Sequence, residues 1–296
     1  MPVSPEKRHG YGLLISLFLI FLLSFSPSSV LSDTLTQGSL LIYVGAASKP
    51  PTEEAAGVFE KKTGIKVYLN IGSSGAILSQ MKLTRRGDIY FPGSSDYMEL
   101  AKREGLVFPE TEARVVYLVP AINVQQGNPK QIQSLKDLTQ SGVRVAIANP
   151  ESVCVGAYAI ETIERVFSAA EKTAFRRNIL NYPESCEKTA NIVALRAVDA
   201  VIGWSVFEHW DPKRIQTIPL KPEEVSRIGY IPAAIVRYTN HRALAQQFLD
   251  FIASPEGKAI YKKYHYFITP EEAFAWLGSS KPIGGEYVVP GDWLTK

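Results

Sequence analysis

The sequence predicts an α/β protein with mainly parallel sheets flanked by helices. Strand-like apolar segments alternate with helix-like amphipathic segments, and two further apolar segments could carry the chain between two domains. The strands are expected at residues 40–44, 65–71, 89–91, 115–124, 143–148, 198–202 and 228–236. The helices are expected at residues 52–63, 75–86, 97–104, 135–140, 155–167, 190–197, 242–253 and 255–263.

The first helix and the strand after it follow from spacing. Residues 52–63 place Ala55 and Phe59 on one apolar face, and Gly64 is a typical helix stop. Residues 65–71 then alternate between apolar and polar side chains, which is typical of a half-buried strand.

Later elements are bounded by proline. Apolar residues recur at helical spacing in 75–86, and Pro92 ends the short strand before it can continue. Residues 115–124 form a long apolar strand interrupted by Pro120, and we expect this strand to cross from one domain to another. Residues 228–236 would carry the chain back.

Two crossings divide the chain into two lobes. The first comprises residues 33–119 and 223–296, with a C-terminal tail at 268–296, and the second comprises 120–222. Two lobes joined by a short hinge suit ligand capture by closure. The alternative is one doubly wound domain with a long insertion.

Residues 1–32 have the parts of a secretory signal. Lys7 and Arg8 give a basic start, residues 13–25 are almost wholly apolar, and cleavage is expected before Asp33. The apolar stretch is shorter than the roughly 20 residues that span a bilayer, although an N-terminal anchor is the alternative. We therefore expect a periplasmic or secreted protein.

The charge balance argues against nucleic acid as a partner. The chain has 32 basic and 29 acidic residues, and without residues 1–32 it has 30 and 28. A nucleic-acid-binding protein would show a concentrated basic face.

Two short segments predict an anion site. Residues 43–48 and 70–76 each begin as an apolar strand, end in small hydroxyl residues and lead into a helix. Free N–H groups at a helix start attract anions, and the helix dipole adds to the attraction. Ser48, Ser73 and Ser74 could instead be ordinary N-caps.

Several motifs occur in an order that matches a known family. They are GAAS at 45–48, FEKKTGIKV at 59–67, GSSG at 72–75, GDIY at 87–90, NPESVCVGAYA at 149–159, VDAVIGW at 198–204 and SPEGKAIYKKY at 254–264. In this order they resemble the periplasmic molybdate-binding proteins of ABC transporters. The resemblance implies a two-lobed periplasmic-binding-protein fold of type II with the ligand cleft between the lobes. It also implies a monomer without enzymatic activity or cofactor, which delivers molybdate or tungstate to an ABC permease in the inner membrane.

The same resemblance implies the ligand contacts. They fall on Ser48, Ser73, Ser74, Val155, Thr189 and Trp204. The serines would offer hydroxyls, and Val155 and Thr189 would offer backbone N–H groups. Trp204 stands where the family has a tyrosine, and its indole has one donor and no acceptor.

The chain has two cysteines, Cys154 and Cys186, which the motifs place near one cleft. In an oxidising compartment an even count permits one disulfide, which we expect here. Two separately buried thiols are the alternative.

A pocket lined only by donors selects its ligand by protonation. A fully ionised oxyanion has only acceptors, whereas hydrogen phosphate carries a proton that would face other donors, at a cost of about 1–3 kcal/mol. Molybdate, tungstate or sulfate is therefore favoured over phosphate.

Rival functions are a ferric-ion binder, which would need converging tyrosines and carboxylates, and a serine hydrolase. No Gly-x-Ser-x-Gly or His-Glu-x-x-His motif supports an enzyme.

Overall fold

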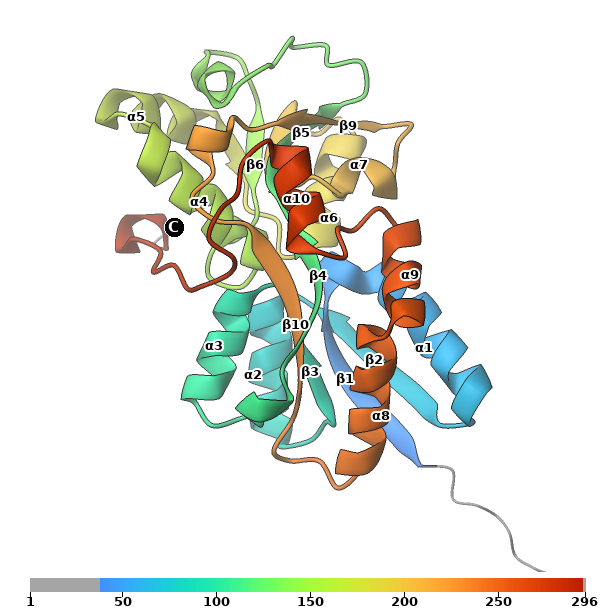
Figure 1. Cartoon of the computed structure of the whole chain (residues 1–296). Helices are drawn as coiled ribbons and strands as arrows, with labels where there is room; N and C mark the ends of the chain where they lie inside the picture. The colour runs from blue at the N-terminus through green and yellow to red at the C-terminus, as the bar shows by residue number, and fades with distance from the viewer. Residues whose placement is uncertain (1–37, 295–296) are drawn as a thin grey trace, which may run out of the picture. The chain divides into compact units, whose positions relative to one another are not determined.

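The computed structural model describes residues 38–294, which form two five-stranded sheets flanked by helices (Figure 1). The first sheet has the order β2-β1-β3-β10-β4, and the second has the order β7-β6-β8-β5-β9. The strands are β1 (Ser39–Gly45), β2 (Lys66–Gly72), β3 (Ile89–Phe91), β4 (Ala113–Leu118), β5 (Pro120–Gln125), β6 (Val145–Ile147), β7 (Ile179–Asn181), β8 (Ala200–Trp204), β9 (Ile215–Pro219) and β10 (Gly229–Ile235). The helices are α1 (Lys49–Thr63), α2 (Ser74–Thr84), α3 (Ser95–Arg103), α4 (Cys154–Val166), α5 (Ala169–Asn178), α6 (Cys186–Ala194), α7 (Phe207–Trp210), α8 (Arg242–Ala253), α9 (Pro255–Lys263) and α10 (Pro270–Leu277). We call each sheet with its helices a lobe.

The α/β fold is confirmed, but both sheets are mixed rather than mainly parallel. In the first, β1 is parallel to β2 and β3, whereas β10 is antiparallel to β3 and β4. In the second, β6 is parallel to β7 and β8, whereas β5 is antiparallel to β8 and β9. The antiparallel pairs involve the strands next to the crossings. A strand that leaves a sheet and one that returns to it run in opposite directions.

The first crossing takes place at one residue. β4 ends at Leu118 and β5 begins at Pro120, so only Val119 separates a strand of one sheet from a strand of the other. The sequence predicted one strand over 115–124, and the structure divides it here. The chain returns between β9 and β10.

Helices cover both faces of the first sheet, with α1, α8 and α9 on one side and α2 and α3 on the other (Figure 1). Along β1 the side chains alternate accordingly. Leu40 and Ile42 share a buried cluster with Phe59 of α1, and Tyr43 faces a second cluster with Met81 of α2.

Proline and glycine set the ends of α1. The helix begins at Lys49, before the predicted start at residue 52, because Pro50 and Pro51 occupy first-turn positions where no N–H is needed. It ends at Gly64, whose φ of 75° is the left-handed conformation that glycine adopts easily.

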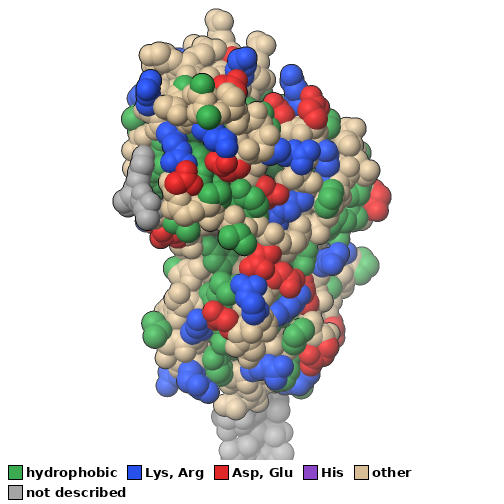
Figure 2. Space-filling view, turned by 90° about the vertical axis from the view of Figure 1, so that its left-hand side faces the viewer, with side chains coloured by type: hydrophobic (Ala, Val, Ile, Leu, Met, Phe, Trp, Pro, Cys, Tyr) green, Lys and Arg blue, Asp and Glu red, His purple; other side chains and the backbone are tan. Residues whose placement is uncertain are grey.

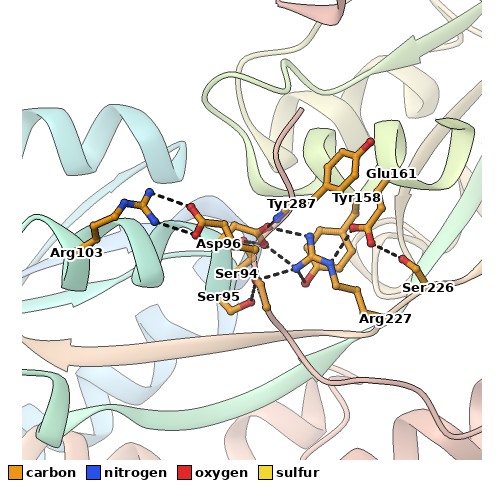
Figure 3. A network of polar contacts seen from close by, with 11 residues as sticks. Ser94, Ser95, Asp96, Arg103, Tyr158, Glu161, Ser226, Arg227 and Tyr287 are labelled. Atoms are coloured by element: carbon orange, nitrogen blue, oxygen red, sulfur yellow. Dashed lines mark hydrogen bonds and ion pairs between the residues drawn. The ribbon is translucent and has the colours of Figure 1, made fainter. Parts of the chain in front are cut away.

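A buried arginine joins the lobes just before β10 (Figure 3). The Arg227 guanidinium donates to Asp96 on α3 at 2.8 and 3.2 Å, and to Glu161 on α4 at 2.8 Å. It also donates to the Gly285 carbonyl at 2.8 Å. Because α3 belongs to the first lobe and α4 to the second, this network links both lobes to the C-terminal tail.

The tail packs against both lobes, whereas the sequence assigned residues 268–296 to the first. Leu277 and Trp293 lie in the buried cluster beneath the second sheet. Trp293 Nε1 donates to Glu164 of α4 at 2.8 Å, while Glu286 forms a bidentate ion pair with Arg103 of α3. The apolar side chains of the tail therefore fill the second core, and its charged ones reach back to the first lobe.

The expected signal at residues 1–32 lies outside the described residues. From residue 38 to residue 294, none of the helices combines the length and the apolar character that crossing a bilayer requires.

Candidate functional site

The predicted serines lie at one edge of the first sheet. β1 and β2 are parallel, and Gly45 pairs with Gly72, so the two loops after these strands leave the sheet side by side. Ser48 is the N-cap residue of α1 and Ser73 that of α2, yet neither side chain makes a capping hydrogen bond. The hydroxyls of Ser48 and Ser73 are therefore not used in helix capping.

Two helix N-termini occupy the matching edge of the second sheet. α4 begins at Cys154 and α6 begins at Cys186, following the parallel neighbours β6 and β7. The two Sγ atoms are 3.8 Å apart, which places the helix starts next to each other. Trp204 ends β8, and β8 is also parallel to β6, so Trp204 lies at the same edge.

The loop after β3 brings the two edges together at Gly93. A Cβ atom added to Gly93 would lie 2.8 Å from Cys154 Sγ, 2.9 Å from Ala47 Cβ and 3.5 Å from Ser74 Oγ. The N-termini of α1, α2, α4 and α6 thus converge on one place. Sequence reasoning missed Gly93, although the Pro92-Gly93 pair marks a tight turn after β3.

Further contacts hold the lobes against each other around this point. The Gly75 N–H of the first lobe donates to the Ser152 carbonyl of the second at 2.9 Å. Lys49, directly after Ser48, pairs with Glu187 on α6 at 3.5 Å. The structure is therefore a form in which the lobes meet.

The serine hydroxyls are buried and under-used. Ser48 Oγ is fully buried and has only long contacts, 3.5 Å to the Gly45 carbonyl and 3.3 Å to Thr52 Oγ1. Ser74 Oγ accepts the Gly93 N–H at 2.9 Å. Because a hydroxyl is both donor and acceptor, the Ser74 O–H proton is still available to a ligand.

Trp204 has an unsatisfied donor. Its side chain is completely buried, and its Nε1 has no hydrogen-bond partner among residues 38–294. Its ring packs edge-on against Tyr158 at 4.9 Å between centroids. A buried donor without an acceptor costs about 1–3 kcal/mol, so an acceptor at this point would be favourable.

Thr189 cannot be the backbone donor that we predicted. The helix begins at Cys186 rather than near residue 190, because Ser185 Oγ caps it by accepting the Lys188 N–H at 3.1 Å. The Thr189 N–H therefore donates within the helix to the Ser185 carbonyl, as does its hydroxyl. The first-turn N–H groups without an intrahelical acceptor belong to residues 186–188.

Val155 lies in the first turn of α4, as predicted for a backbone donor. The hydrogen bond with Cys186 and burial raise the pKa of Cys154, and the nearby Val155 N–H offsets this only in part. The predicted disulfide is not formed in this structure. Cys154 and Cys186 are free and buried thiols.

A wide cleft lies outside this convergence. It measures about 730 Å³ and opens between the lobes, but of the six predicted contacts only Ser73 lines it. Its walls carry four glutamates and two lysines: Glu104, Glu151, Glu184, Glu187, Lys82 and Lys188. This acidic and spacious cleft is a poor site for a small anion, so we place the candidate site at the sealed inner point where the helices meet.

On the face shown in Figure 2, Lys and Arg side chains are interspersed with Asp and Glu. This face therefore presents no basic patch that would bind anions in place of the candidate site. Within residues 38–294, no group of three or more His, Cys, Asp and Glu side chains could hold a metal ion.

Two α/β lobes with helix N-termini facing each other across their contact define a solute-binding protein of the two-lobed class. The chain belongs to the bacterial extracellular solute-binding protein family, which it matches over residues 40–267. Proteins of this family serve ABC importers.

The chain is similar in sequence and structure to several named binding proteins. It is 24% identical to the molybdate-binding protein ModA of Rhodobacter capsulatus, over 77% of this chain and 88% of that protein. Among solved structures, the periplasmic molybdate-binding protein of Azotobacter vinelandii superposes with a TM-score of 0.66 at 20% identity, covering 78% of this chain and 99% of that one. The sulfate-binding protein SubI of Mycobacterium tuberculosis superposes with a TM-score of 0.71 at 17% identity, covering 83% and 93%. These structural likenesses establish the fold, and neither the family nor these likenesses point to an enzyme.

Proposed function

We propose that this chain captures molybdate or tungstate between its lobes, outside the cytoplasm, and delivers it as a monomer to an ABC permease. The observation that carries the proposal is the convergence at Gly93, where the starts of four helices meet around Ser74, Ala47 and Cys154. The named molybdate-binding relatives and the expected secretory signal support it.

The available groups suit a fully ionised oxyanion. Ser48 and Ser74 offer hydroxyl protons, Val155 offers a backbone N–H, and Trp204 offers an indole N–H without a partner. Each helix start adds a positive dipole end. A dianion brings only acceptors, so every contact is a charge-assisted hydrogen bond.

Binding requires the lobes to part and close again. The predicted groups, Ser73 excepted, are set back from the open cleft, so an anion must enter while the lobes are separated. Closure then surrounds it with donors from both lobes. Such hinge closure is the usual way in which two-lobed proteins take up a ligand.

Calorimetry with molybdate, tungstate, sulfate and phosphate tests the proposal. Molybdate and tungstate should bind, and phosphate should bind far more weakly. The Ser74→Ala variant should bind molybdate about 10 to 100 times more weakly, because it loses one charge-assisted hydrogen bond worth about 1.5–3 kcal/mol.

Ser79→Ala is the matched control, because Ser79 lies on the same helix but is exposed in the outer cleft. Its affinity should equal that of the wild type. A preference for sulfate over molybdate would reassign the ligand, and equal molybdate affinity in Ser74→Ala would refute the site.

A further inference from the structure

Two thiols lie at the centre of the lobe contact. Cys154 and Cys186 are the first residues of α4 and α6, and their Sγ atoms are 3.8 Å apart. Both side chains are at most 2% exposed. A disulfide bond is about 2.05 Å long, so the sulfurs need to approach by less than 2 Å.

Both cysteines belong to the second lobe, but they lie in one buried cluster that also contains residues of the first lobe, among them Ala47. Gly93 lies against Cys154, since a Cβ atom added to Gly93 would be 2.8 Å from Cys154 Sγ, with Ala47 and Ser74 on its other sides. The Gly75–Ser152 hydrogen bond closes the same contact from the side of the cleft. A reagent in solvent can therefore reach the sulfurs only when the lobes separate.

The closed form also suppresses thiol chemistry. Exchange with a disulfide requires a thiolate, and the hydrogen bond to Cys186 together with burial raises the pKa of Cys154. Separation of the lobes would hydrate both thiols. Each thiol would then lie at a helix N-terminus, where the helix dipole stabilises a thiolate.

We propose that Cys154 and Cys186 are a redox-active dithiol, which forms a disulfide when the lobes open. We propose further that a bound oxyanion protects the two thiols from oxidation by keeping the lobes closed. The oxidant is a small-molecule disulfide of the glutathione class. One cysteine thiolate attacks it and releases one thiol, and the second cysteine then displaces the other. The protein loses two S–H bonds and gains one S–S bond. The reagent loses its S–S bond and is reduced to two thiols.

The protection by ligand rests on the proposed function, whereas formation of the disulfide does not. Intact-mass spectrometry separates the two. The purified chain, first reduced and freed of ligand, is incubated with oxidised glutathione with and without molybdate. We expect the ligand-free protein to lose the mass of two hydrogen atoms. At a molybdate concentration 100 times the dissociation constant the rate should fall roughly 100-fold, because only the ligand-free fraction opens.

Single variants identify the reaction. In Cys186→Ser the remaining Cys154 should keep glutathione as a mixed disulfide, because no second cysteine is present to displace it. The urea-unfolded chain should oxidise faster than the folded, ligand-free protein, because its thiols are no longer covered.

Each negative result has its own meaning. If the folded, ligand-free protein keeps both thiols after an incubation with oxidised glutathione that oxidises the unfolded chain, the two cysteines are not a redox-active dithiol. An unchanged rate at a molybdate concentration that calorimetry shows to be saturating would refute protection by the ligand. Calorimetry without any binding would overturn both the protection and the proposed function, while the result for the ligand-free protein would still decide the disulfide.

Discussion

Replacing Arg227 by methionine tests how the lobes and the tail are held together. The side chain is 7% exposed, and its guanidinium donates to the carboxylates of Asp96 and Glu161. Methionine fills similar space but leaves the buried Asp96 carboxylate and the half-buried Glu161 carboxylate without their cation. Removing one partner from a buried ion pair costs about 3–5 kcal/mol. For a chain of this size, 1 kcal/mol shifts the melting temperature by about 2–4 °C, so Arg227→Met should melt roughly 6–20 °C lower.

Arg103→Met is the matched control. Arg103 also forms a bidentate ion pair, with Glu286, but its side chain is 57% exposed. Exposed ion pairs contribute little to stability, so this variant should melt at most about 4 °C lower. The melting is followed by circular dichroism at one pH and salt concentration. If Arg227→Met melts as high as Arg103→Met, the buried network does not hold the lobes together.

Three further variants probe other contacts. Burial opposes ionisation of Asp199, but the hydrogen bonds from Arg144 outweigh it and lower the pKa of Asp199. This stabilisation is present above the unfolded pKa of about 3.9 and is lost as the pH falls through the folded value, so Asp199→Asn should flatten the stability profile below about pH 4 in urea melts. Gly93→Ala places a methyl group 2.8 Å from Cys154 Sγ, and denaturant melts should show a loss of about 1–3 kcal/mol. Trp293→Ala removes a buried ring, and it should cost about 3 kcal/mol and expose the tail to limited proteolysis. An unchanged pH dependence of stability in Asp199→Asn would contradict the first expectation, and an unchanged denaturant midpoint in Gly93→Ala the second. A tail that resists protease in Trp293→Ala would contradict the third.

Strong periodicity made much of the fold predictable. The segments at residues 40–44, 65–71 and 89–91 are strands of the first sheet. The first and third are apolar, the second alternates between apolar and polar side chains, and each is followed directly by glycine or proline. The helix-like pattern at 155–167 corresponds to α4, which begins one residue earlier and buries one long apolar face.

Weakly patterned elements were missed. The sequence of α5 is mostly charged and polar, and only Phe175 is buried, so its amphipathic signal is faint. The three-residue strand β7 is partly exposed and exists because it pairs with β6. The expected helix over 135–140 is a short 3₁₀ segment, Leu135–Thr139, with a capping box at Ser134.

The candidate site was predictable where it depends on sheet geometry. Ser48 and Ser74 share an edge because Gly45 and Gly72 pair in parallel. The position of Thr189 was wrong because the Ser185 cap starts α6 earlier than its apolar spacing suggests. A Ser followed by Glu187 in the first turn was the available signal.

The contact between the lobes was beyond sequence reasoning. Nothing in the spacing of Gly93, Ala47 and Cys154 shows that they meet, because the meeting depends on the packing of one sheet edge against another. The same holds for Arg227, whose partners lie 131 and 66 residues away along the chain. Such long-range polar contacts follow from the tertiary fold and not from a local pattern.

Anomalous diffraction from crystals grown with molybdate tests the central claim most directly. The account predicts one molybdenum peak between the lobes, within about 4 Å of Ser74 Oγ and Val155 N, because the oxyanion oxygens must accept hydrogen bonds from both. A peak only in the outer cleft beside Lys188, or none in crystals of protein that binds molybdate in solution, would contradict it.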